Sequence, residues 1–122
     1  MNVLLSIKPK YVEKIIAGTK KYEFRRSIFK KYVENIYIYE SAPHQRIIGF
    51  FPFQGFIFDT TDNLWDKCNI SGGVSKEEFY AYFQEKKFGY AIIINSLKTL
   101  DVPINPFETI PNFTPPQSFI YL

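Results

Sequence analysis

The chain has 122 residues, of which 46% are hydrophobic and 22% charged, and its formal net charge is +3. This length fits one domain spanning residues 1–122, with a core large enough to fold without a disulfide or a metal. A single cysteine, Cys68, and a single histidine, His44, exclude an internal disulfide and a Cys/His zinc site. No charged leader precedes an apolar run and no segment reaches membrane-spanning length, so we expect a cytoplasmic protein with no membrane partner.

The positive charge is concentrated in the first part of the chain. Residues 1–50 contain ten Lys or Arg against four Asp or Glu, whereas residues 51–122 contain five against eight. Six of the twelve residues from Lys20 to Lys31 are cationic, and Glu23 is the only acid among them. A local basic patch suits a partner that carries phosphate. Aromatic residues make up 19% of the chain, which favours strands and also offers surfaces for base stacking.

Periodicity predicts strands and one helix in the first 41 residues. An apolar run predicts a strand over Val3–Lys8, and Pro9 suits the first position of a following helix. The helix has an apolar stripe at spacing 3.6 and is followed by Gly18, where a left-handed residue often ends a helix. The stretch KKYEFRR then alternates, with Glu23 and Arg25 on one face. A third strand is expected over Glu34–Ser41.

The remaining chain continues the mixture of strands and helices. Arg46–Asp59 reads as one long strand bent at its glycines and proline, followed by a short helix over Thr60–Cys68. Ser75 and Glu78 have the spacing of a capping box that opens another helix. Gly89–Asp101 predicts a strand, the proline-rich tail is expected to be irregular, and QSFIYL closes the chain as a last strand. The expected class is α+β, a small and mostly antiparallel β-barrel with two or three flanking helices.

The order helix, glycine, strand carries a motif, Gly18-x-Lys20-x-x-Glu23-x-Arg25, that resembles the signature of the ASCH domain, a branch of the PUA-like superfamily. The segments LSIKPKYVEKIIAGTKKYEFRR, IYIYESAP, GVSKEEFYAYF, GYAI and PPQSFIYL also resemble a group of small stand-alone ASCH proteins of bacteria, archaea and phages. The resemblance covers most of the chain. It implies a PUA-like barrel with a polar cleft beside the first helix.

The resemblance also implies a set of functions. PUA-like domains commonly bind RNA; some ASCH relatives hydrolyse N4-acetylcytidine or act as ribonucleases, and another subgroup is fused to transcription coactivators. In the amidohydrolase subgroup the motif lysine matches Lys20, but the threonine nucleophile falls at Glu23. A carboxylate does not replace that hydroxyl in acyl transfer. The segment from Cys68 to Lys76 also lacks the acid of that subgroup's site, which argues against the same acyl hydrolysis here.

The motif residues have a chemical interpretation of their own. Glu23 and Arg25 lie on one strand face about 7 Å apart. An arginine fork matches phosphate oxygens, and a glutamate accepts from base or ribose donors, so Lys20, Glu23 and Arg25 suit a nucleotide. The structural alternative is an internal Glu23–Arg25 salt bridge that braces the fold. If the protein is an enzyme, Glu23 is the candidate general base and Lys20 stabilises developing negative charge.

Other residues extend the candidate site. Lys8, just before the first helix, offers an anion site together with the helix N-terminus. A tyrosine of the third strand could stack on a base, and polar groups near the C-terminus could read a base edge. The full set of candidate ligand- or RNA-binding residues is Lys8, Lys20, Glu23, Arg25, Tyr39, Ser41, Gln117 and Ser118. We expect no metal site and no cofactor.

Three functions remain open from the sequence. The first is an RNA- or nucleotide-binding protein in RNA metabolism or transcription-linked regulation, with RNA or a nucleotide-like ligand as the partner. The second is a hydrolase that acts on RNA or a modified nucleoside. The third is a protein-interaction module in transcription regulation, whose basic patch meets an acidic protein partner.

Overall fold

The computed structural model describes all residues from 1 to 122. In chain order its elements are β1 (Asn2–Ile7), α1 (Pro9–Ala17), β2 (Tyr22–Arg25), β3 (Asn35–Glu40), β4 (Arg46–Pro52), β5 (Phe56–Thr60), α2 (Thr61–Cys68), the 3-10 turn η1 (Asn69–Ser71), α3 (Lys76–Tyr82), β6 (Phe88–Ile93), β7 (Lys98–Ile104), α4 (Pro106–Thr109) and β8 (Phe119–Tyr121). None of the helices is both long and apolar enough to cross a bilayer.

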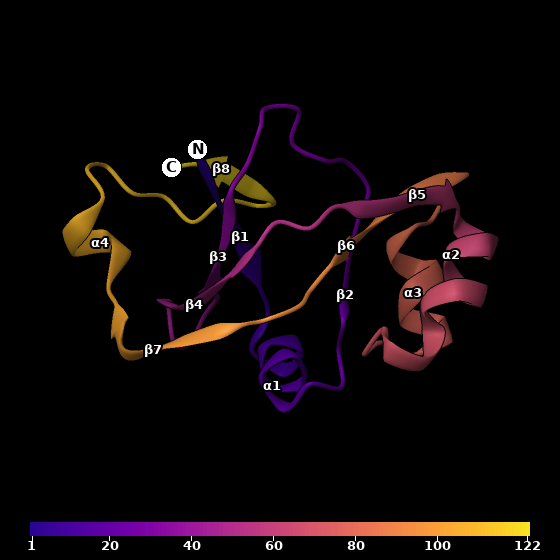
Figure 1. Cartoon of the computed structure of the whole chain (residues 1–122), viewed down its shortest axis with the longest axis horizontal. Helices are drawn as coiled ribbons and strands as arrows, with labels where there is room; N and C mark the ends of the chain where they lie inside the picture. The colour runs from indigo at the N-terminus through magenta and orange to yellow at the C-terminus, as the bar shows by residue number, and fades with distance from the viewer.

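The strands form two sheets, shown with their helices in Figure 1. Sheet A has five strands in the order β7-β4-β3-β1-β8, and sheet B has three in the order β2-β6-β5. Only β1 and β3 pair in parallel; every other pairing is antiparallel. The α+β class is therefore confirmed. The pairings do not show closure of a barrel, and there are four α-helices rather than two or three.

Both long strands expected after residue 45 are split between the two sheets. Arg46–Asp59 becomes β4 in sheet A and β5 in sheet B, with Gly55 between them at φ +105°. Such a backbone angle suits glycine and turns the chain from one sheet to the other. Gly89–Asp101 likewise becomes β6 in sheet B and β7 in sheet A. The tail is also more regular than expected, because it contains α4, capped by the side chain of Asn105.

The helix ends follow the sequence signals. Pro9 occupies the first turn of α1, and Gly18 ends it in the left-handed region at φ +81°. The Thr60 side chain accepts from the backbone N–H of Asn63 at the start of α2. Ser75 and Glu78 form the complete capping box of α3, as predicted. These caps fix where α1 and α3 begin and end, and both helices border the candidate site.

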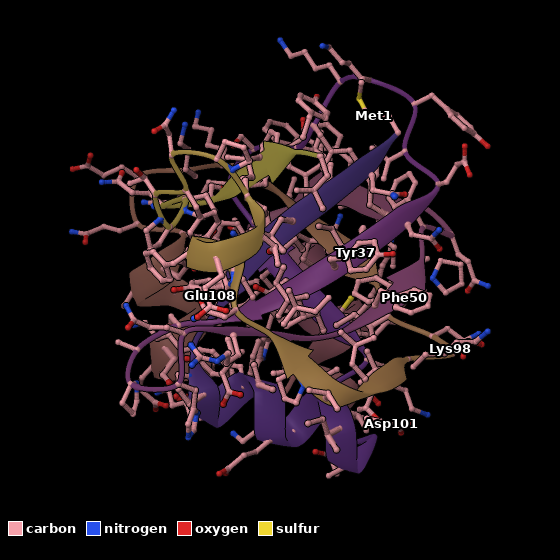
Figure 2. The ribbon with its side chains drawn as sticks, turned by 90° about the vertical axis from the view of Figure 1, so that its left-hand side faces the viewer. Met1, Tyr37, Phe50, Lys98, Asp101 and Glu108 are labelled. Atoms are coloured by element: carbon pink, nitrogen blue, oxygen red, sulfur yellow. The ribbon has the colours of Figure 1, made fainter.

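Three apolar clusters hold these layers together. The largest lies between sheet A, sheet B and α1, and includes Val12, Ile38 and Ile92. A second packs sheet B against α2 and α3 around Leu64. The third lies on the other face of sheet A, where Figure 2 shows the ribbon of β7 and α4 passing in front of β3. On that face the rings of Tyr37 and Phe50 stack 5.1 Å apart.

Truncating Leu64 tests the second cluster. Its side chain is fully buried, so Leu64→Ala removes apolar contacts and leaves a cavity. We expect the free energy of unfolding to fall by about 2–5 kcal/mol. Urea unfolding followed by the fluorescence of Trp65, the only tryptophan, measures the change. Ile70→Ala is the control, because Ile70 is 94% exposed and should change stability little; equal losses in both variants would contradict the assignment of this core.

Candidate active site in the cleft between α1 and α3

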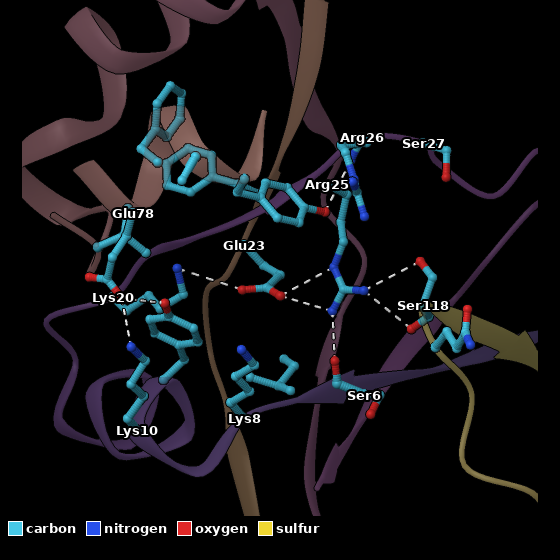
Figure 3. A pocket seen from close by; sticks show the side chains of 18 residues that line it. Ser6, Lys8, Lys10, Lys20, Glu23, Arg25, Arg26, Ser27, Glu78 and Ser118 are labelled. Carbon is cyan, nitrogen blue, oxygen red and sulfur yellow. Dashed lines mark hydrogen bonds and ion pairs between the residues drawn. The ribbon is translucent and has the colours of Figure 1, made fainter. Parts of the chain in front are cut away.

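A cleft of about 600 Å³ opens where β1, α1, β2 and α3 meet the segment before β8. Figure 3 shows Glu23 at its centre, with Lys20 on one side and Arg25 on the other. The cleft also receives Lys8 and Lys10 from the start of α1 and Ser118 from the C-terminal segment. Its walls therefore come from positions up to 112 residues apart in the chain, from Ser6 to Ser118.

Arg25 holds Glu23 through two hydrogen bonds to one carboxylate oxygen. Its Nε donates to Glu23 Oε2 at 3.2 Å and its Nη2 donates to the same oxygen at 2.8 Å. Both residues are more than 90% buried. The other oxygen, Glu23 Oε1, accepts no hydrogen bond and lies 3.6 Å from the ammonium of Lys20. Glu23 is thus fixed at one oxygen and free to accept at the other.

The remaining donors of Arg25 are also occupied. Nη2 donates to the carbonyl oxygen of Ser6 at 2.9 Å. Nη1 donates to the carbonyl oxygen of Ser118 at 3.2 Å and to its hydroxyl at 3.3 Å. A guanidinium has five N–H donors, and all five have partners inside the protein. Arg25 therefore braces β2 against β1 and the C-terminal segment, and any contact with a phosphate would require it to give up one of these bonds.

Lys20 is buried to the same degree, with 2% of its surface exposed. Its Nζ donates to the carbonyl oxygen of Gly72 at 2.6 Å and lies over the rings of Tyr11 and Phe24, 5.3 and 5.1 Å from their centroids. Burial lowers the pKa of this ammonium, while the charge of Glu23 acts in the opposite direction. Lys20 therefore acts on the cleft through its charge on Glu23 rather than by reaching out to solvent.

One glycine makes room for the lysine. Gly73 has φ +68°, and a Cβ at this position would lie 2.7 Å from the Cβ of Lys20. The stretch ISGG, which the sequence marks only as a break between helices, therefore closes over the lysine side chain. A larger residue at Gly73 would be strained and would displace Lys20.

Across the mouth of the cleft, Glu78 joins α3 to α1. Its Oε2 accepts from Lys10 Nζ at 2.6 Å and from the Tyr11 hydroxyl at 2.7 Å, while Oε1 accepts from the backbone N–H of Ser75. The bond from Lys10, supported by the other two, holds the pKa of Glu78 well below its ordinary value. The residue that caps α3 is therefore also a clamp between the two helices.

The structure brings together most of the residues that the sequence singled out. The cleft is lined by Lys8, Lys20, Glu23, Arg25, Gln117 and Ser118. Tyr39 and Ser41 do not line it. Tyr39 faces the third apolar cluster, 1% exposed, and its hydroxyl has no hydrogen-bond partner. Ser41 follows β3, with its backbone N–H donating to the carbonyl oxygen of Ile7.

Sequence reasoning missed part of the cleft wall. Arg26, which the sequence did not single out, is exposed and lines the cleft, with its guanidinium 4.8 Å from the centroid of the Tyr82 ring. Glu78 carried a helix-capping signal only, and nothing in the sequence links it to Lys10, 68 positions away. No group of three or more His, Cys, Asp and Glu side chains is arranged so that it could hold a metal ion.

Comparison with known proteins gives relatives over nearly the whole chain, although no family model matches. An "ASCH domain-containing ribonuclease" of Zymomonas mobilis is 27% identical over 99% of this chain and 84% of that protein. A shorter similarity, to ATP synthase subunit alpha of Ureaplasma parvum, is 23% identical and covers 12% of that protein.

The solved structures agree with the first relative. The crystal structure of ASCH from Zymomonas mobilis superposes with a TM-score of 0.90 at 26% identity and covers 99% of this chain and 87% of that chain. Structures of a serine-to-alanine and a tyrosine-to-phenylalanine variant of the same protein give TM-scores of 0.91 and 0.90. The fold described above is thus that of an ASCH domain. The chain is an ASCH domain protein, homologous to the Zymomonas ribonuclease over nearly its full length.

The Glu78 clamp generates a pH prediction. A carboxylate whose pKa is lowered on folding stabilises the fold above its ordinary pKa of 4.5, and that contribution is lost as the pH falls towards the lower folded value. We expect wild type to be more stable than Glu78→Gln at pH 7 and the difference to shrink by pH 3. Urea unfolding at both pH values measures it. Asp59, whose pKa is held at about 2 mainly by Lys67, also contributes less stability in acid. This loss is the same in both proteins, so it cancels in the difference. A difference that does not vary with pH would contradict the clamp.

The buried ion pair gives a second prediction. Glu23→Gln leaves the charge of Arg25 buried without its counter-charge, and breaking a buried pair in this way costs about 3–5 kcal/mol. We expect a loss in the free energy of unfolding of about 3 kcal/mol, since glutamine retains one acceptor oxygen. Glu13→Gln on the exposed side of α1 is the matched control and should change stability by less than about 0.5 kcal/mol. Losses of equal size would mean that the pair does not brace the fold.

Proposed function

We propose that this protein is a hydrolase that cleaves RNA in the cleft between α1 and α3. The observation that carries the proposal is a buried carboxylate, Glu23, held by Arg25 at one oxygen and left open at the other. The homology to a protein described as a ribonuclease supports RNA as the substrate. It favours the catalytic alternative over a protein that only binds RNA. The interaction module in transcription regulation stays a prediction.

The roles of the residues follow from their hydrogen bonds. Glu23 Oε1 would take a proton from a hydroxyl nucleophile, either the ribose 2′-OH or a water molecule. Lys20, 3.6 Å from that oxygen, adds a positive charge where negative charge develops on the phosphate. Arg25 holds the carboxylate in orientation and is a positioning residue, because its donors are already used.

The phosphate itself is assigned to Lys8 and the N-terminus of α1. Lys8 is exposed, lines the cleft and directly precedes Pro9, so its ammonium lies at the N-terminal end of α1. Anions bind well at such helix starts. The positive charge near Glu23 thus has two parts: the buried Lys20 and Arg25, which pair with the carboxylate, and the exposed Lys8, which would contact the substrate.

A hydroxyl from the C-terminal segment extends the proposed site. Ser118 Oγ lies in the cleft and accepts from Arg25. The Zymomonas protein has been studied as a serine-to-alanine and a tyrosine-to-phenylalanine variant. In this chain, Ser118→Ala removes the serine hydroxyl that Arg25 contacts in the cleft.

The proposal is tested by turnover and binding measured side by side. We expect wild type to cleave a labelled RNA and Glu23→Gln to cleave it at least about 100-fold more slowly, the usual contribution of a general base, while binding it with similar affinity. The chemical groups at the ends of the RNA fragments identify the nucleophile, because a 2′,3′-cyclic phosphate indicates attack by the 2′-OH. Rates are measured where Trp65 fluorescence shows both proteins folded, with Glu13→Gln as control.

Two results would contradict this assignment. Cleavage by Glu23→Gln at the wild-type rate would remove Glu23 from the chemistry. Binding of RNA by wild type without turnover of any RNA or modified nucleoside would leave a binding protein in place of an enzyme.

A further inference from the structure

One face of the antiparallel β5–β6 pair carries aromatic side chains that no other element covers. Phe56, Phe58 and Phe88 are 40%, 52% and 50% exposed, and Tyr90 is half-buried. The strand register places all four on the same face, with Phe58 directly opposite Tyr90. The other face of these strands packs against α2 and α3, which Figure 1 shows gathered on one side of β5.

These four residues form a continuous row of rings, called the aromatic ladder below. The centroid of Tyr90 lies 5.3 Å from that of Phe56 and 4.9 Å from that of Phe58. Phe58 and Phe88 follow at 5.5 Å, with their planes only 16° apart. Side chains that serve a core are buried, whereas a contiguous exposed apolar patch marks a surface that binds something.

Positive charge flanks both ends of the ladder. Lys86 and Lys87 are exposed and directly precede Phe88; Glu85 is the one acid beside them. At the other end the loop of residues 26–33 carries no acid. Lys30 is exposed there, whereas the charged groups of Arg26 and Lys31 lie over the rings of Tyr82 and Tyr121. This loop reaches the ladder through ring contacts of Phe29 with Phe53, 5.0 Å apart, and of Phe53 with Phe56, 6.4 Å apart.

Asp59, the acidic residue of β5, does not neutralise the positive charge beside the ladder. Asp59 alternates to the opposite face of the strand from Phe58, where it forms an ion pair with Lys67 of α2 at 2.8 Å. The ladder therefore combines flat apolar rings with cationic ends. A polyanion with exposed planar bases matches both features, whereas an apolar protein surface would match only the rings.

The ladder lies next to the cleft wall in the strand register, although none of its four rings lines the cleft. Tyr90 is the register partner of Arg25, whose side chain points to the same face of sheet B. Neighbouring strands are about 4.8 Å apart, so the ladder begins one strand away from the cleft wall. An RNA strand with a phosphate in the cleft would have its next bases within reach of Tyr90 and Phe58.

We propose that the aromatic ladder is a stacking platform for the bases of single-stranded RNA, with the lysines at its two ends meeting the RNA backbone. The proposal rests on the proposed function, since it extends the path of the same substrate beyond the cleft. Single-stranded RNA is favoured over a duplex because its unpaired bases can lie against aromatic rings. The ladder would determine how long a strand is held, while the cleft performs the chemistry.

The test uses a labelled single-stranded RNA of 12 nucleotides and the double variant Phe58→Ala with Phe88→Ala. Stacking on one ring contributes enough that we expect roughly ten-fold weaker binding or more, measured by fluorescence anisotropy. Phe58→Tyr with Phe88→Tyr retains both rings and should bind like wild type. The salt dependence should keep its slope in the alanine variant, and lose slope in Lys86→Ala with Lys87→Ala. Ile70→Ala, which removes an exposed aliphatic side chain elsewhere, is the control.

A dinucleotide substrate that fills only the cleft separates this proposal from the proposed function. The ladder variants should cleave it at the wild-type rate, while Glu23→Gln should not cleave it.

Unchanged affinity of the alanine variant for the 12-nucleotide RNA, with cleavage intact, would overturn the platform alone. If wild type does not cleave RNA but the alanine variant binds it more weakly, the proposed hydrolase activity is wrong and the proposed stacking role of the ladder stands. If the alanine variant converts a dimer into a monomer in sedimentation and binds RNA like wild type, the face is an interface between copies and the platform is overturned.

Discussion

The burial of one carboxylate between two cations is the constraint on which the rest of the cleft depends. Glu23 can lose its water only because Arg25 supplies two hydrogen bonds and Lys20 a second positive charge. Those cations in turn need partners of their own, which they find in the carbonyl oxygens of Ser6, Gly72 and Ser118. The ion triad thus ties β2 to three distant segments, and a change at any of its members is felt across the cleft.

Because the N–H donors of Arg25 are all occupied, the basic residues of the cleft have different roles. Arginine is usually the residue that grips phosphate, because its fork fits two oxygens. In this chain the guanidinium of Arg25 holds the Glu23 carboxylate instead, and the exposed Lys8 faces solvent. The division favours a carboxylate kept in one orientation over a surface that binds anions. It explains why an acid occurs within the most basic stretch of the sequence.

Local signals account for what could be predicted, and long-range contacts account for what could not. Pro9, Gly18 and the Ser75–Glu78 box marked helix ends correctly, because caps depend on neighbouring residues. The motif residues were found through strand alternation and family resemblance. The split of Arg46–Asp59 between two sheets was missed, since both halves have the same aromatic composition and only tertiary pairing separates them. The partners of Arg25 and Glu78 lie 93 and 68 positions away, beyond any periodicity.

The position of Ser118 in the site has a consequence for how the protein folds. It reaches Arg25 across 93 residues, and the strand that follows it, β8, pairs with β1 at the opposite end of the chain. Contacts of such high sequence separation form late and slow the folding of a domain. During synthesis, helix α1 and strand β2 leave the ribosome long before the segment that completes their cleft. The nascent chain therefore carries every acidic and basic group of the motif before it has the segment that completes the cleft around them.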